Sequence, residues 1–224
     1  ETNKLKLNIY TNNSGKIESN IILTKKKGNW RSNLFSHISY FDREIDNHGF
    51  HHNHSDHSGD GFMDMPKVKQ VSLLNRWKYY GLDKYRFQIN LRAVLEERNS
   101  GQIANNEDII NPYIVSSDNK IIQLYTKLGK IYSDKRSIGS QFALTLHNQD
   151  MQIGNNLYDA KQESFFINIV EQNQVRKKSL LKYGVSYSAD RYHESLSASS
   201  FNIKSRVDLV TGLFAENAYK TNNF

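Results

Sequence analysis

The run YRFQINLRAVLE, residues 85–96, decides the fold because it has the cleanest two-residue period in the chain. Its odd positions, from Tyr85 to Leu95, are all apolar, whereas Arg86, Arg92 and Glu96 stand among the even positions. Successive side chains of a strand point to opposite faces, so this run predicts a strand with one apolar and one largely polar face. In a soluble sandwich the polar face would contact water, and in a membrane barrel the apolar face would contact lipid.

The same alternation recurs along the whole chain and predicts about ten strands. In the last of them the face is ambiguous, because Leu209, Leu213 and Ala215 compete with Val210 and Phe214. Most of the strands reach ten residues once their polar ends are included, whereas soluble strands have roughly five or six. The expected strands cover 5–9, 17–23, 30–40, 71–79, 85–96, 122–128, 138–146, 165–169, 181–187 and 205–219.

The connections between these strands alternate in length. Short turns are expected at 27–29, 81–84, 133–136 and 174–179, and long loops at 43–65, 97–118, 148–162 and 190–203. Short turns on one rim and long loops on the other are typical of outer-membrane barrels. The sequence therefore predicts an all-β fold, an antiparallel transmembrane β-barrel of meandering strands.

Composition excludes several other classes of protein. The 224 residues contain no cysteine, which excludes disulfides and thiolate metal sites, and no apolar run of 18 residues that could form a transmembrane helix. The net charge is +7, but the 30 Lys and Arg residues are scattered and gather in turns, so no nucleic-acid partner is expected. A mean hydropathy of −0.69 with many aromatic residues fits a barrel, and it also fits a polar soluble β-protein.

The run DGFMDMPKVKQVSLLNRWKYYG, residues 60–81, resembles a barrel segment of TonB-dependent outer-membrane receptors of Bacteroidetes type. In that family a loop of the pattern Asp-x-Asn-x-Asp-Gly-Phe-x-Asp-x-Pro enters a strand ending in Asn-Arg-Trp-Lys-Tyr, which matches residues 75–79. The stretches 184–187 and 210–219, the latter with Phe214-Ala215-Glu216, also resemble barrel strands of that family.

This resemblance implies active uptake of a metal chelate such as a siderophore, haem or cobalamin across a Gram-negative outer membrane. The family also has a plug domain, a motif that contacts the TonB complex, and a barrel of twenty-two strands. The chain shows neither the plug nor the motif and about ten strands, so we expect a partial barrel, residues 1–224, that begins just after the plug. The alternatives are a complete small outer-membrane barrel and a secreted, calcium-dependent, glycan-binding β-sandwich.

Two kinds of metal site are predicted in the loop before residue 65. Asp56, Ser58, Asp60 and Asp64 stand at positions 1, 3, 5 and 9 of an EF-hand-like pattern with Gly61 at position 6, which predicts Ca²⁺ in loop 56–64. Lys67 replaces the bidentate Glu at position 12, so the affinity should be low. Five imidazoles in the same loop could capture haem or a metal chelate, and these are His48, His51, His52, His54 and His57.

The polar face offers a second kind of substrate contact. Arg76, Lys78, Arg86 and Arg92 are predicted to face the lumen, where they would contact the plug or an anionic substrate. Glu96 and Glu97 are adjacent but point to opposite faces, and no nucleophile or phosphate-binding motif occurs. We therefore expect a receptor rather than an enzyme, with no catalytic residues.

Overall fold

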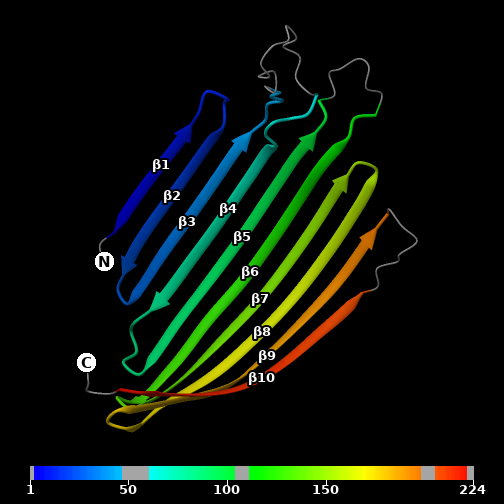
Figure 1. The fold of residues 1–224 in the computed structure, drawn as a ribbon. Helices are drawn as coiled ribbons and strands as arrows, with labels where there is room; N and C mark the ends of the chain where they lie inside the picture. Colours follow the sequence, from blue (N-terminus) through cyan, green and yellow to red (C-terminus); the bar gives the residue numbers. More distant parts are fainter. Residues whose placement is uncertain (1–2, 47–60, 104–110, 198–204, 221–224) are drawn as a thin grey trace.

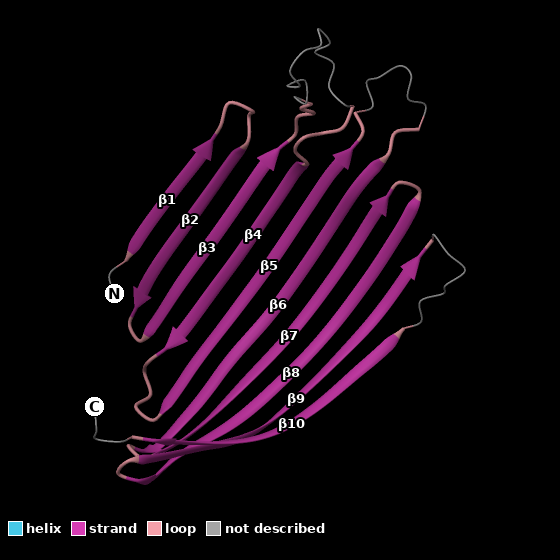
Figure 2. Cartoon of the chain, viewed as in Figure 1, coloured by secondary structure: helices cyan, strands magenta, loops and turns pink. Residues whose placement is uncertain are grey.

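The computed structural model describes residues 3–46, 61–103, 111–197 and 205–220, and these form one antiparallel sheet (Figures 1 and 2). Strands adjacent in sequence are adjacent in the sheet throughout. Nothing within those ranges forms a helix of the length and apolarity that a membrane span needs. The strands are β1 (Lys4–Thr11), β2 (Ile17–Lys27), β3 (Trp30–Phe41), β4 (Lys67–Tyr79), β5 (Tyr85–Gly101), β6 (Ile114–Ser133), β7 (Arg136–Ile153), β8 (Asn156–Arg176), β9 (Ser179–Leu196) and β10 (Arg206–Tyr219).

The predicted all-β meander of ten strands is confirmed, and all the strands except β1 exceed ten residues. The sheet is curved, and β1 and β10 lie at its opposite edges without pairing to each other (Figure 1). A sandwich would need two packed sheets, whereas the described strands make a single layer. The architecture is that of a section of barrel wall.

The predicted long loop at 148–162 is wrong. β7 continues to Ile153 and β8 starts at Asn156, so only a two-residue turn separates them. Gly154 has φ of +58°, which an L side chain rarely adopts, and so permits this tight reversal. Most residues of 148–162 are polar because this hairpin extends past the apolar part of the sheet, and that polarity resembles a loop in the sequence.

We call the end of the sheet that carries turns 28–29, 80–84, 134–135 and 177–178 the short-turn rim. The opposite end, the long-loop rim, carries the connections 12–16, 42–66, 102–113 and 197–205, together with the tight turn of the β7–β8 hairpin. Three of the four predicted long loops therefore lie on one rim, and all four predicted short turns lie on the other.

The strand register assigns each side chain to a face, because residues opposite one another in antiparallel strands share a face. Leu91 is opposite Asn75 on one side and Leu124 on the other, and Leu124 is opposite Leu144. We call the face that carries these three leucines the apolar face and the other, which carries Arg92, the polar face. The register also resolves the ambiguity in β10, where Leu209, Leu213 and Ala215 are opposite apolar-face residues of β9, namely Ala189, Val185 and Tyr183.

The apolar face is uncovered. Its side chains include Ile122, which is 60% exposed, and Leu213, which is 85% exposed, and the only buried apolar residues of the described chain are Phe41 and Val94. The chain exposes 16341 Å², whereas a compact protein of 26.0 kDa exposes about 10,500 Å². Because water disfavours exposed apolar surface at roughly 25 cal/mol per Å², this face needs an apolar environment.

The apolar face has the height of a membrane. On β5 it runs from Tyr85 to Leu95, which is about 33 Å along the strand and, at a barrel tilt of about 40°, about 25 Å across a bilayer. Charged residues replace the apolar ones toward the long-loop rim, where Glu97, Asp118 and Asp150 follow one another in register. The apolar side chains therefore form a band with a polar border.

Candidate functional site

Four cations from three neighbouring strands gather on the polar face. Lys78 of β4 and Lys127 of β6 are register partners of the same residue, Gln88 of β5, so their strands are about 10 Å apart. Arg76 and Arg92 lie on the same face, successively closer to the long-loop rim. Arg76 is opposite Asn90, and Arg92 is opposite Leu74. We call Arg76, Lys78, Arg92 and Lys127 the cation cluster. The sequence predicts the first three of these residues to face the lumen, whereas the place of Lys127 beside them follows only from the strand register.

Neutral amides, rather than carboxylates, surround the cation cluster. The Arg76 Nε donates a hydrogen bond to Asn90 Oδ1 at 3.3 Å, and Gln88 Nε2 donates to the same oxygen at 3.2 Å. No Asp or Glu among the described residues forms an ion pair with any member of the cluster. Uncompensated like charges repel one another and attract an anion, so the cluster favours an anionic partner.

A small hollow of about 240 Å³ opens beside the cluster on the polar face. Lys78, Gln88 and Lys127 line it, and Gly129 contributes bare backbone. Gly129 is opposite another glycine, Gly139, so no side chain fills this part of the face. The hollow combines positive charge with room for a small acidic group.

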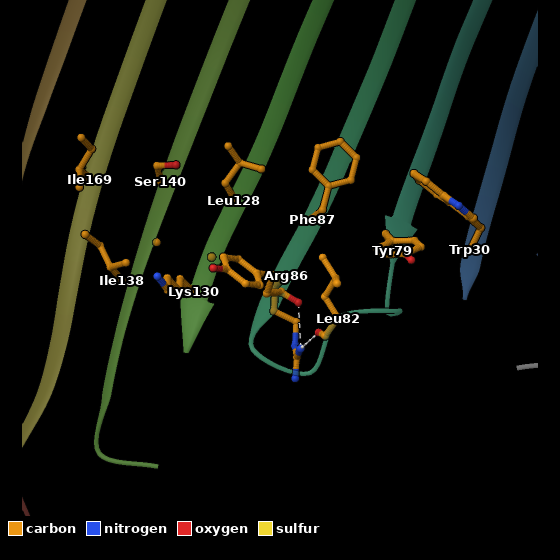
Figure 3. Close-up of a pocket in the computed structure, with 13 residues that line it drawn as sticks. Trp30, Tyr79, Leu82, Arg86, Phe87, Leu128, Lys130, Ile138, Ser140 and Ile169 are labelled. Carbon is orange, nitrogen blue, oxygen red and sulfur yellow. Dashed lines mark hydrogen bonds between the residues drawn. The ribbon is translucent and has the colours of Figure 1, made fainter. Parts of the chain in front are cut away.

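Arg86 also lines the hollow, but its guanidinium is folded onto the turn between β4 and β5 (Figure 3). Its Nη1 donates hydrogen bonds to the carbonyl oxygens of Leu82, Asp83 and Tyr85 at 3.1, 3.0 and 3.0 Å. Near it, the Arg31 guanidinium lies 4.5 Å from the centroid of the Tyr80 ring. Arg86 thus fixes the turn and contributes charge to the hollow.

Most of the predicted metal and imidazole ligands lie outside the described residues, and these are Asp56, Ser58, Asp60, His48, His51, His52, His54 and His57. Asp64 is described, and its N–H donates to the Ile45 carbonyl oxygen at 2.8 Å. The part of the chain that the structure describes contains no group of three or more His, Asp or Glu residues placed to hold a metal. Calcium binding and imidazole capture therefore stay predictions.

The end of that loop is attached to the long-loop rim. The Met63 N–H donates to the Gly101 carbonyl at 2.9 Å, and the Ile103 N–H donates to the Gly61 carbonyl at 2.8 Å. The Gly61 N–H donates to Asp46 Oδ2 at 2.8 Å, which ties both sides of the loop together. The loop therefore leaves the sheet at the rim opposite the hollow.

Comparison with known proteins found no matching protein-family model and no matching curated protein. Among solved structures, the chain is similar to the ferric yersiniabactin uptake receptor FyuA from Yersinia pestis, with a TM-score of 0.46 and 12% sequence identity. The similarity covers 96% of this chain and 37% of that one, so the chain spans little more than a third of the receptor it matches.

Proposed function

We propose that the chain is a section of the wall of an outer-membrane receptor barrel that takes up an anionic metal chelate. The observation that carries this proposal is the pairing of an uncovered apolar band of membrane height with a polar face on the same single sheet. Lipid would cover the apolar face, and the polar face would line a wet lumen.

The cation cluster supports an anionic cargo. Lys78 and Lys127 would face the lumen without carboxylate partners among the described residues, so an acidic group of a chelate would meet positive charge there that no protein carboxylate compensates. Among the chelates that the family resemblance implies, this favours siderophores and haem, which carry acidic groups. The lumen would also hold the plug of the same protein, and the TonB complex would supply the energy for release.

The loop at 48–64 would capture the chelate at the cell surface. It leaves the sheet at the long-loop rim, and the cation cluster lies toward the short-turn rim. A chelate would therefore meet the imidazoles first and the cations later. Ca²⁺ in loop 56–64 would order the loop for this first contact.

Membrane extraction and uptake together test the proposal. The receptor that contains this chain should stay in the membrane fraction after alkaline carbonate washing, and in that receptor the double variant Lys78→Gln with Lys127→Gln should lower uptake of an anionic ferric chelate severalfold. Lys120→Gln, on the apolar face, is the matched control and should leave uptake unchanged. A protein that is soluble without detergent, or equal uptake by both variants, would contradict the proposal.

A further inference from the structure

A groove of about 710 Å³ crosses the apolar face at its short-turn end (Figure 3). One row of register partners forms its length, running from Trp30 of β3 through Phe87 and Leu128 to Ile169 of β8. Its volume falls within the roughly 300–1,000 Å³ of sites that hold small molecules. The groove is thus larger and more apolar than the hollow on the polar face.

The shape of the groove follows from the sizes of the side chains in that row. Trp30 packs against Tyr79 with ring centroids 4.8 Å apart and against Phe87 at 6.2 Å, which builds a high aromatic wall. Ser140 is the small residue of the row and stands between Leu128 and Ile169. A large side chain at position 140 would fill this depression, so the groove depends on that serine.

A lysine without an acidic partner stands at the mouth of the groove. Lys130 Nζ lies 5.5 Å from the ring centroid of Tyr85 and 5.1 Å from that of Tyr132, within cation–π distance of both. None of the described carboxylates forms an ion pair with Lys130. Glu171, which lies in the same row of register partners, forms its ion pair with Arg136 at 2.6 Å. The aromatic rings orient the ammonium group and leave its charge uncompensated.

We propose that this groove is a binding site for one anionic phospholipid. The inference rests on the proposed membrane barrel, which would place the groove at the inner border of the apolar band. An acyl chain would lie along Leu128, Ser140 and Phe87, and the phosphate would pair with Lys130. An anionic head group suits the site better than a zwitterionic one, because Glu171, the acid in the row of Lys130, is already paired with Arg136 and does not offer itself to a second, positive group of the head.

Lipid retention by the intact protein tests this inference. The protein is purified from membranes, exchanged into detergent, and its retained phospholipids are quantified by mass spectrometry. The unaltered protein should retain anionic phospholipid in preference to zwitterionic phospholipid. Lys130→Gln should lower the anionic fraction about fivefold, and Lys130→Arg should preserve it. Lys120→Gln is the control. Lys120 lies at the other border of the apolar face and pairs with Asp118 at 3.4 Å, so its loss should leave the lipid preference unchanged.

Ser140→Trp gives an independent arm, since it should displace the acyl chain and leave Lys130 unchanged. Equal retention of the two lipid classes, or unchanged retention in Lys130→Gln, would overturn the inference. A Ser140→Cys protein that cross-links to a second copy would also overturn it, since protein would then occupy the groove. The same preparation distinguishes the two proposals. A protein that resists carbonate extraction but shows no lipid preference refutes only this lipid site. A protein that is soluble without detergent refutes the membrane barrel itself.

Discussion

Asp150 of β7 and Asp159 of β8 are direct register partners, and a hydrogen bond between their carboxyl groups raises the pKa of Asp150. Burial and the negative charge of Asp159 act in the same direction, while Lys120 and Lys161 oppose them. The pair lies beyond the apolar band, in the hairpin that extends past it. Two carboxylates at one position repel each other, so one of them holds its proton more tightly than usual.

This pair makes the tip of the β7–β8 hairpin sensitive to pH. Folding raises the pKa of Asp150, so the protonated carboxyl stabilises the folded hairpin. This stabilisation is fully present below the ordinary pKa of 3.8 and is lost as the pH rises through the raised pKa. We expect Asp150→Asn to slow amide hydrogen exchange at residues 148–161 near neutral pH and to change little below pH 3.8. Asp134→Asn at the opposite rim serves as the control. Equal effects of Asp150→Asn at both pH values would contradict the prediction.

A charge in the middle of the apolar face should prevent membrane insertion. Leu124→Arg places a cation between Leu91 and Leu144, which should cost about 2–4 kcal/mol at the bilayer midplane. Its neighbour Gln123 points to the polar face and donates to Thr145 Oγ1 at 3.1 Å, so Gln123→Arg should cost only about 1 kcal/mol. The amount of carbonate-resistant protein measures both. Similar losses for the two variants would show that the face assignment is incorrect.

Gly184 of β9 should not tolerate a side chain, because atoms of β8 and β10 occupy the space where a Cβ would lie. A Cβ there would overlap the Ile169 carbonyl oxygen and come within 2.7 Å of the Phe214 Cζ. We expect Gly184→Ala to destabilise the β9–β10 pair by roughly 1–3 kcal/mol, measured as a lower denaturant midpoint. At Gly212, the control in the same strand pair, a Cβ meets only the rotatable Ser186 hydroxyl, so Gly212→Ala should cost less. The reverse order would argue against this packing.

Calcium affinity of loop 56–64 can be measured directly. Isothermal titration should show heat release with the unaltered protein and little with Asp60→Ala, because that carboxylate is predicted to be a ligand. A chelator should remove the effect, and Asp208→Asn, in β10, should leave it intact. If neither the unaltered protein nor Asp60→Ala releases heat, the calcium prediction fails.

The number of strands, and the apolar face of every strand except β10, could be predicted from the sequence because a period of two is visible within a single strand. Lys127 shows where this stops, since its position beside Lys78 depends on the register of three strands, and no single strand reveals that. Arg86 was assigned to the polar face correctly, but the folding of its guanidinium onto the turn requires the turn geometry. The loop predicted at 148–162 failed because polarity alone does not distinguish a loop from a hairpin in water.

The strictly sequential strand order has a consequence for the rate and order of folding. Each strand pairs only with its predecessor and successor, so every strand pairing joins two strands that are consecutive along the chain. Pairing between consecutive strands limits the length of chain that each hairpin has to close, and so limits the conformational entropy lost in closing it. A nascent sheet can therefore extend by one strand at a time.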